Sequence, residues 1–347
     1  MQPSTLKPVL FAALATGGLW SALSQAESPR LALFYAIHVH APELEGSKLD
    51  TRLARQDPQT ARFLASGLEA LASTLEEHGA RASFQLTQAA LGAVCGDVGP
   101  QVLHDLVAAG HDVGVHGHDA AEMVQAASRL QIECGLVART GSGLLGPGMM
   151  MGGGRRGARG FLLDPDLFVQ GAQSAQSAGL EVLTLNTTQT ATREPALSQI
   201  CGGQLGANPA GAPDSGVLPL AWRPALDQGE ICGTGGEGLA LLDHTPGDWL
   251  LDERGAPRAS VAELADADFA QLKPLLTAAL TAPGADGQTT SWGFVSHLHE
   301  YMPGAVEMGP VSPDALAALD RWLRWSTDVS EGTAVWKTPP DIVDGGL

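Results

Sequence analysis

Short apolar runs of strand length alternate along this chain with segments whose apolar residues recur at helical spacing. The first run, 31–39 (LALFYAIHV), is followed by a segment at 60–78 that places leucines on one helical face and has Gly79 at its expected end. The same pattern predicts further strands at 81–86, 111–118, 181–186, 239–243 and 292–297, and further helices at 100–109, 119–130, 165–178, 261–280 and 312–325. This alternation indicates an α/β fold with a parallel sheet, of which a barrel is one form.

Two glycine-rich stretches interrupt the alternation, at 141–160 and 201–238. The first, GSGLLGPGMMMGGGRRGARG, lacks the GxxxxGK[ST] spacing of a phosphate-binding loop, so we interpret it as a loop over a site. We expect one domain at 27–347, with a loop insertion near 190–235.

Residues 1–26 have the composition of a secretory signal peptide. Lys7 provides a positive start, 8–23 is apolar, and Ser24-Gln25-Ala26 places small residues at a cleavage site. An uncleaved anchor is the alternative, but about 16 apolar residues are few for a membrane span. We therefore expect a secreted or periplasmic protein without a stable membrane span.

The charge of the chain excludes one large class of partners. It has 20 basic and 38 acidic residues, a net charge of -18, and no basic stripe. Phosphate groups are bound by clustered Lys and Arg, so we expect neither a nucleic-acid partner nor binding to an anionic membrane surface.

The 4 cysteines of an exported chain favour disulfides. None lies in a CxxC motif, which argues against a thiolate metal site or a redox pair. Four cysteines allow three connectivities, of which we favour the sequential one. The predicted bonds join Cys95 with Cys134 and Cys201 with Cys232.

Six of the 10 histidines form three His-x-His pairs, whereas random placement would give about 0.3 such pairs. The pairs are His38 and His40, His116 and His118, and His297 and His299. Each lies at the C-terminal end of a predicted strand, where two residues in alternate positions point to the same face. These strand ends are where sites form in parallel α/β folds, and imidazole is the commonest zinc ligand, so a metal site is predicted. The alternative is packed or surface histidines.

Carboxylates follow each pair in the sequence. A water activated by a metal needs a base, and Glu43, Asp119 and Glu300 are candidates. We place Asp119 and Glu43 above Glu300.

Two segments carry a family resemblance. Residues 75–84 (LEEHGARASF) and 102–118 (VLHDLVAAGHDVGVHGH) resemble the polysaccharide deacetylases of the NodB homology type. The resemblance implies a (β/α) barrel, seven-stranded and irregular. It also implies a divalent metal, usually zinc, and removal of acetyl groups from N- or O-acetylated sugars.

Carried over to this chain, the resemblance assigns roles to particular residues. His116 corresponds to the first histidine of the family's H-[ST]-x-x-H metal motif, and His118 replaces the second because position 120 is alanine. The family's T-F-D-D-G motif, with its base and metal-binding aspartates, corresponds to 36–40, where both aspartates are absent and His38 or His40 binds the metal instead.

The later motifs of the family have counterparts too. The segment 296–299 resembles the late motif in which a histidine acts as general acid, so His297 and His299 either donate a proton or complete the metal shell. Trp222 and Arg223, in Trp-Arg-Pro, are candidates for the Arg-Pro motif and for substrate binding.

These observations predict an exported metal-dependent hydrolase that removes acyl groups from a polysaccharide or a cell-envelope glycan. The metal ligands are drawn from His38, His40, His116, His118 and His299, and the catalytic groups are Asp119, Glu43 and His297. The first alternative is a catalytically silent barrel that binds metal or glycan. The second is a glycosidase of a related barrel family, which would need two carboxylates facing each other across the sugar.

Overall fold

We describe the protein from a computed structural model, which describes residues 31–41, 58–117, 119–143, 165–185, 218–219, 223, 225–226, 236–243, 261–281, 290–302 and 309–345. The strands are β1 (Leu31–Val39), β2 (Ala82–Leu86), β3 (Asp112–His116), β4 (Thr140–Ser142), β5 (Val182–Leu185), β6 (Leu218–Pro219), β7 (Ala240–Asp243), β8 (Thr290–His297) and β9 (Ala334–Trp336). The helices are α2 (Pro58–Glu76), α3 (Gln88–Ala93), η1 (Val94–Val98), α4 (Gln101–Ala108), α5 (Ala120–Cys134), α6 (Pro165–Ser177), α8 (Val261–Thr281), η4 (Leu298–Tyr301), α9 (Pro313–Ser330) and α10 (Pro339–Gly345).

Seven strands of the described chain form a parallel sheet in the order β8-β1-β2-β3-β4-β5-β7. The short strand β6 pairs antiparallel with β8, and β9 pairs with the start of β1, ahead of the residues that pair with β2. The two ends of the parallel run, β7 and β8, lie close to each other. The sheet is therefore a curled half-barrel, which confirms the predicted seven-stranded α/β fold.

Side chains of β1 alternate between the two faces of this curled sheet. Leu33, Tyr35 and Ile37 belong to the large core beneath the helices. Ala32 and Phe34 instead contact a small apolar cluster with Val182 of β5, Leu242 of β7 and Ile342 of α10. Strands that are not neighbours in the sheet meet in this cluster, so this is the inner face of the half-barrel. His38 lies on the same face by alternation.

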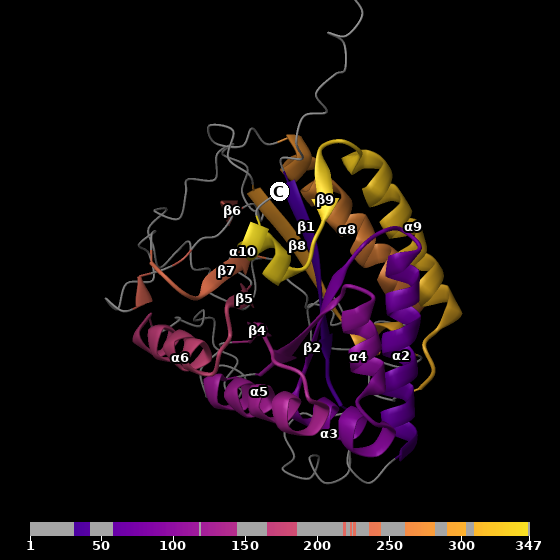
Figure 1. Cartoon of the computed structure of the whole chain (residues 1–347). Coiled ribbons are helices and arrows are strands. Elements are labelled where there is room, and N and C mark those ends of the chain that lie inside the picture. Colours follow the sequence, from indigo (N-terminus) through magenta and orange to yellow (C-terminus); the bar gives the residue numbers. More distant parts are fainter. Residues whose placement is uncertain are drawn as a thin grey trace, which may run out of the picture.

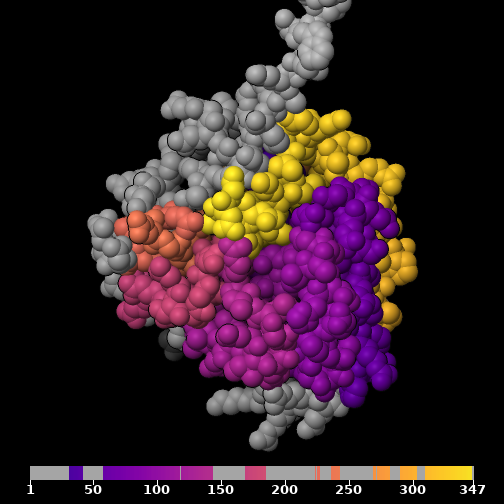
Figure 2. All heavy atoms as spheres, in the orientation of Figure 1, coloured from indigo at the N-terminus to yellow at the C-terminus, as the bar shows by residue number. Residues whose placement is uncertain are grey.

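Helices cover the outer face. Figure 1 shows α2, α8 and α9 along one side of the sheet, with α5 and α6 continuing the layer beside β4 and β5. The described helices pack closely over the face seen in Figure 2. Helix α2 buries Leu64, Leu68, Leu71 and Leu75 against the sheet, the face that the apolar spacing predicts. Gly79 follows with a φ of 64°, which suits the left-handed end of a helix.

Several elements differ from the sequence-based expectation. The strand β4 occupies 140–142, so the predicted loop at 141–160 begins with strand residues. The short elements α3, η1, β6, β9 and α10 were not predicted. None of the helices in the described ranges is long and apolar enough to cross a membrane.

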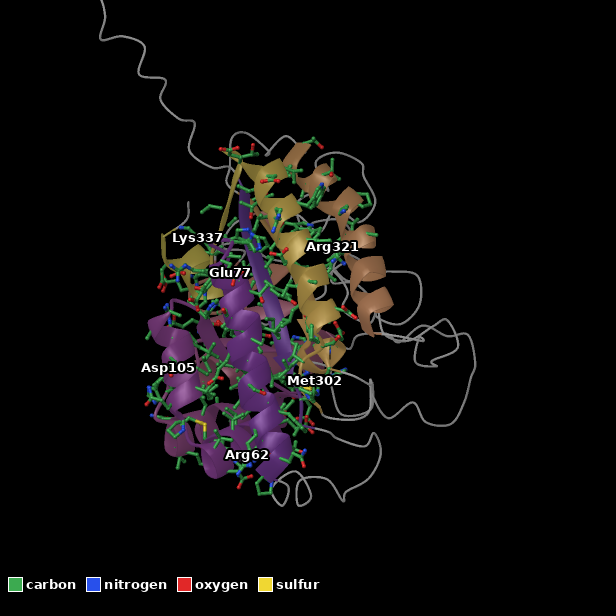
Figure 3. The ribbon with its side chains drawn as sticks, turned by 90° about the vertical axis from the view of Figure 1, so that its right-hand side faces the viewer. Arg62, Glu77, Asp105, Met302, Arg321 and Lys337 are labelled. Atoms are coloured by element: carbon green, nitrogen blue, oxygen red, sulfur yellow. A yellow bond between two sulfur atoms is a disulfide. The ribbon has the colours of Figure 1, made fainter. Side chains whose placement is uncertain are left out.

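The bond between Cys95 and Cys134 joins η1 to the end of α5. It is the first bond of the sequential pairing, and it appears as a yellow stick in Figure 3. His104 of α4 contacts the same corner, with its Nε2 2.9 Å from the carbonyl oxygen of Cys134. Cys201 and Cys232 lie outside the described residues.

Candidate metal centre

Three imidazoles meet at the end of the half-barrel where the strands finish. His38 near the end of β1, His40 just after β1 and His116 at the end of β3 each offer one ligand atom, and these atoms lie within 4.8 Å of one another. The rings of His38 and His116 stack with centroids 4.1 Å apart, and the rings of His40 and His116 are 4.8 Å apart. We call His38, His40 and His116 the histidine triad.

The triad suits a transition-metal ion. Its three donors are imidazole nitrogens, and His38 and His116 are only 8% and 6% exposed. Zinc–nitrogen bonds of about 2.0–2.1 Å place two ligand nitrogens at most about 4.2 Å apart, so small side-chain rotations would bring the triad to coordination distance. Nitrogen donors favour zinc, copper or nickel over magnesium or calcium.

The third pair of histidines lies beside the triad. His297, the last residue of β8, pairs in register with His38, and its ring centroid is 5.2 Å from that of His38 and 5.3 Å from that of His40. The ring centroid of His299 lies 5.1 Å from that of His297 and 6.1 Å from that of His40. His299 belongs to the turn η4 and not to a strand. The expectation that both members of this pair point from one strand is therefore wrong, although both rings reach the same region.

Glu300 orients His297. The Nδ1 of His297 is 2.8 Å from Oε1 of Glu300, which is 8% exposed. This bond leaves the other ring nitrogen, Nε2, as the one not engaged by Glu300. Among the carboxylates predicted from the sequence, Glu300 ranked below Asp119 and Glu43. The three-residue spacing from His297 to Glu300 within one helical turn is the signal that would have found the contact.

His299 is neutral near pH 7. Burial, and then the neighbouring His297, lower the pKa of His299 to about 3. A neutral imidazole keeps a nitrogen lone pair, as a metal ligand requires.

Ser142 contacts the triad from β4. Its Oγ lies 2.8 Å from Nδ1 of His116, its partner in the β3–β4 register. Ser142 was not predicted from the sequence, because 141–160 was interpreted as a loop. The strand Thr140-Gly141-Ser142 has no apolar residue larger than glycine and gives no periodic signal.

Both tyrosines of the chain lie behind His297, on the outer face. Their hydroxyls are 2.5 Å apart, and each also contacts Oγ of Ser296. Burial, then Tyr301, raise the pKa of Tyr35 well above its usual value, so the phenol stays protonated. The three hydroxyls join β1, β8 and the turn η4, and thereby hold the segment that carries His297 and Glu300.

Met302 anchors the far end of that turn. In Figure 3 it lies below Glu77, toward the half of the molecule that holds Arg62. An added Cβ at Gly67 of α2 would lie 3.1 Å from Cε of Met302, so the methionine packs directly on this helix.

The other candidate residues take different places. Oδ1 of Asp119 accepts a hydrogen bond from the backbone nitrogen of Glu122 at 2.8 Å and caps α5. The guanidinium of Arg223 donates to the carbonyl oxygen of Gly238. Glu43, His118 and Trp222 lie outside the described residues, so their predicted roles stay predictions.

Two histidines outside the pairs are structural. The Nε2 of His78 is 2.8 Å from Oδ1 of Asp320, which links α2 to α9. His111 is 4% exposed, and its Nδ1 accepts a hydrogen bond from the backbone nitrogen of Ala82 at 3.1 Å. It lies just after the end of α4.

No protein-family model and no curated protein sequence matches the chain. Solved structures resemble it in fold. A probable polysaccharide deacetylase from Pseudomonas aeruginosa PAO1 has a TM-score of 0.50 at 14% identity, covering 92% of this chain and 93% of that one. The Puue allantoinase has a TM-score of 0.52 at 13% identity, covering 92% of each chain. At these identities the likeness is one of fold, and the fold is the one expected from the resemblance to NodB-type deacetylases.

Proposed function

We propose that this protein is a metal-dependent hydrolase that removes acyl groups, acetyl above all, from a polysaccharide or a cell-envelope glycan. The observation that carries the proposal is the histidine triad at the C-terminal end of the strands, of which His38 and His116 are buried and His40 is half-buried. In folds built from parallel strands and helices this is the end where catalytic groups gather. The fold likeness to a probable polysaccharide deacetylase supports the choice of substrate class.

In this proposal His38, His40 and His116 hold one divalent ion, zinc in the first place. The bound ion would supply Lewis-acid chemistry, polarising the acyl carbonyl and making water a stronger nucleophile. His118 and His299 are the remaining predicted ligands. His299 lies beside the triad as a neutral imidazole and can complete the shell.

His297 is the proposed proton carrier. Its Nδ1–H donates to the buried carboxylate of Glu300, which fixes the ring and stabilises the imidazolium form. Its ring lies beside both His38 and His40, so a proton on Nε2 has a short path to a substrate held at the triad. Asp119 already uses one oxygen as a helix cap, and this favours the His297–Glu300 pair over Asp119 for this step.

The proposal is tested by acetate release from a panel of acetylated glycans by the zinc-loaded full chain. His116→Ala removes a triad member and should abolish release. His78→Ala, which removes a histidine that links α2 to α9, is the matched control and should retain it. Release that persists in His116→Ala would refute the proposed centre.

The same assay separates the alternatives. Zinc binding without turnover on any acetylated glycan would favour a silent barrel that binds metal or glycan. Cleavage of glycosidic bonds would favour a glycosidase, although Glu300 is the carboxylate that a described hydrogen bond places against the paired histidines.

Export is proposed on the sequence of residues 1–26 alone. Cell fractionation followed by N-terminal sequencing of the mature protein tests it, with Glu27 as the expected first residue. A cytosolic protein that keeps Met1 would contradict it.

A further inference from the structure

Strand β4 and Gly143, which follows it, position His116 of the histidine triad. We propose that Ser142 is a positioning residue that engages Nδ1 of His116, so that Nε2 is the nitrogen presented to the metal. The inference rests on the proposed metal centre and adds the atom that binds and the residue that selects it.

The contact between the two side chains is short and protected from water. Oγ of Ser142 lies 2.8 Å from Nδ1 of His116, and the two residues are 1% and 6% exposed. A neutral imidazole carries one proton, so when one nitrogen binds a metal the other must be the N–H donor. Nδ1 is the nitrogen that faces the serine oxygen. It therefore donates to Ser142 in the metal-bound form, and Nε2 is left to bind.

The backbone around Ser142 holds the ends of β3 and β4 close together. The amide of Gly117, just after His116, donates to the carbonyl oxygen of Ser142 at 3.1 Å. Gly143 has a φ of 91°, and an added Cβ there would overlap the carbonyl oxygen of Gly117 and lie 3.1 Å from Cε1 of His116. Only glycine accommodates both the conformation and the space. The ends of β3 and β4 are thus pressed together beside the imidazole.

His116 and His297 have different hydrogen-bond partners at Nδ1. His116 has a hydroxyl partner, which orients the ring without favouring a charged imidazole. His297 has the carboxylate of Glu300 in the same position, bonded to Nδ1 at 2.8 Å. A hydroxyl orients the ring without adding a charge, whereas a carboxylate also stabilises an imidazolium.

The direct test uses the full chain with ¹⁵N-labelled histidine, loaded with ¹¹³Cd²⁺. We expect scalar coupling between the cadmium and Nε2 of His116, with the two ring nitrogens assigned by through-bond correlation from the ring protons to the backbone of His116. Coupling to Nδ1 of His116 would overturn the inference. This measurement is made on the unaltered protein and so does not depend on how any Ser142 variant folds.

The affinity for Zn²⁺ gives a second test. Losing an outer-shell partner of a ligand histidine typically weakens metal binding by about 10- to 100-fold, and we expect this for Ser142→Ala. Thr140→Val is the matched control. Thr140 lies two residues earlier on the same face of β4 and is also buried, and no hydrogen bond among the described residues joins its hydroxyl to the triad. It should bind Zn²⁺ like the unaltered protein.

The outcomes separate the two proposals. If the unaltered protein binds Zn²⁺ and His116→Ala does not, but Ser142→Ala binds it as tightly as the unaltered protein, the role of Ser142 is refuted and the metal centre stands. If the unaltered protein binds neither Zn²⁺ nor Cd²⁺, the proposed function fails and this inference fails with it.

Discussion

The imidazole of His38 stacks on that of His116 with 4.1 Å between ring centroids, although a third strand, β2, separates the strands that carry them. The register of β1, β2 and β3 places the two rings within two residues of the same level of the sheet. Gln85 of β2 pairs with His38 on one side and with Gly114 on the other, and His116 lies two residues further along β3 than Gly114.

The first prediction is that metal stabilises the fold through the triad. Zn²⁺ at a hundred times its Kd should raise the free energy of unfolding by about 2.7 kcal/mol, because the ion binds the folded chain. His38→Ala should lose this gain, whereas His78→Ala should keep it. Denaturant unfolding with and without Zn²⁺ measures both, and an equal gain in His38→Ala would contradict the assignment of His38 as a ligand.

The second prediction concerns the carboxylate behind His297. Glu300→Gln keeps a hydrogen-bonding group but removes the charge that favours the imidazolium, so kcat for deacetylation should fall by about 10- to 100-fold. Zinc affinity should stay within about twofold, since Glu300 is not placed in the triad. Glu133→Gln, which breaks the exposed pair with Arg129, is the control and should leave kcat unchanged. An unaltered kcat in Glu300→Gln would refute the proton-carrying role.

The sequence is informative about the strands that carry the histidines and much less so about their partners. Strand β1 has the predicted bounds, because its nine consecutive buried residues are apolar or aromatic apart from His38. Strand β4 has three residues, and its register comes from pairing with β3 and β5 on either side. Ser142 therefore became visible only when the strands were assembled. The hydroxyl contact between Tyr35 and Tyr301 likewise joins distant parts of the chain and leaves no local pattern.

The convergence of the histidine pairs could be predicted, since the ends of parallel strands share one edge. The directions in which their rings point could not be predicted. His40 lies just beyond β1 and His299 lies in the turn η4, so alternation along a strand does not set the direction of either ring. These directions depend on the turns after the strands, and the structure of a turn follows from its packing more than from a repeating pattern.

The third prediction concerns the tyrosine pair. Tyr35→Phe removes one hydroxyl from a fully buried contact and should lower the free energy of unfolding by about 1–3 kcal/mol. Because Tyr301 is its partner, Tyr35→Phe and Tyr301→Phe should be coupled in a double-mutant cycle, with an interaction energy of about 0.5–3 kcal/mol. Urea unfolding of the four proteins measures the coupling. Strictly additive effects would show that the two hydroxyls act independently.

The fourth prediction is a pH dependence of stability at His111. Burial lowers the pKa of His111; Glu76, with its Oε1 3.5 Å from Nε2, opposes this, and Arg81 adds a smaller lowering effect. The folded imidazole therefore stays neutral at pH values where the unfolded chain, with a pKa of about 6.5, takes up a proton. Its contribution to stability is complete above that pH and is lost as the pH falls below it.

The measurement compares the unaltered protein with His111→Asn, which keeps a side-chain acceptor near the amide of Ala82. Between pH 7.5 and 5.5 the unaltered protein should lose more free energy of unfolding than the variant, by at most about 1.4 kcal/mol per pH unit. The difference between the two curves isolates His111 from the other histidines. Parallel curves would contradict the assignment of a lowered pKa to His111.

The central claim, that His38, His40 and His116 together bind one metal ion, is tested most directly by an anomalous difference map at the zinc absorption edge. Crystals of the full chain grown with one equivalent of Zn²⁺ should show one strong peak, bonded to a nitrogen of each of the three rings at about 2.0–2.1 Å. A map without a peak among these rings, or with its strongest peak at other side chains, would contradict the claim.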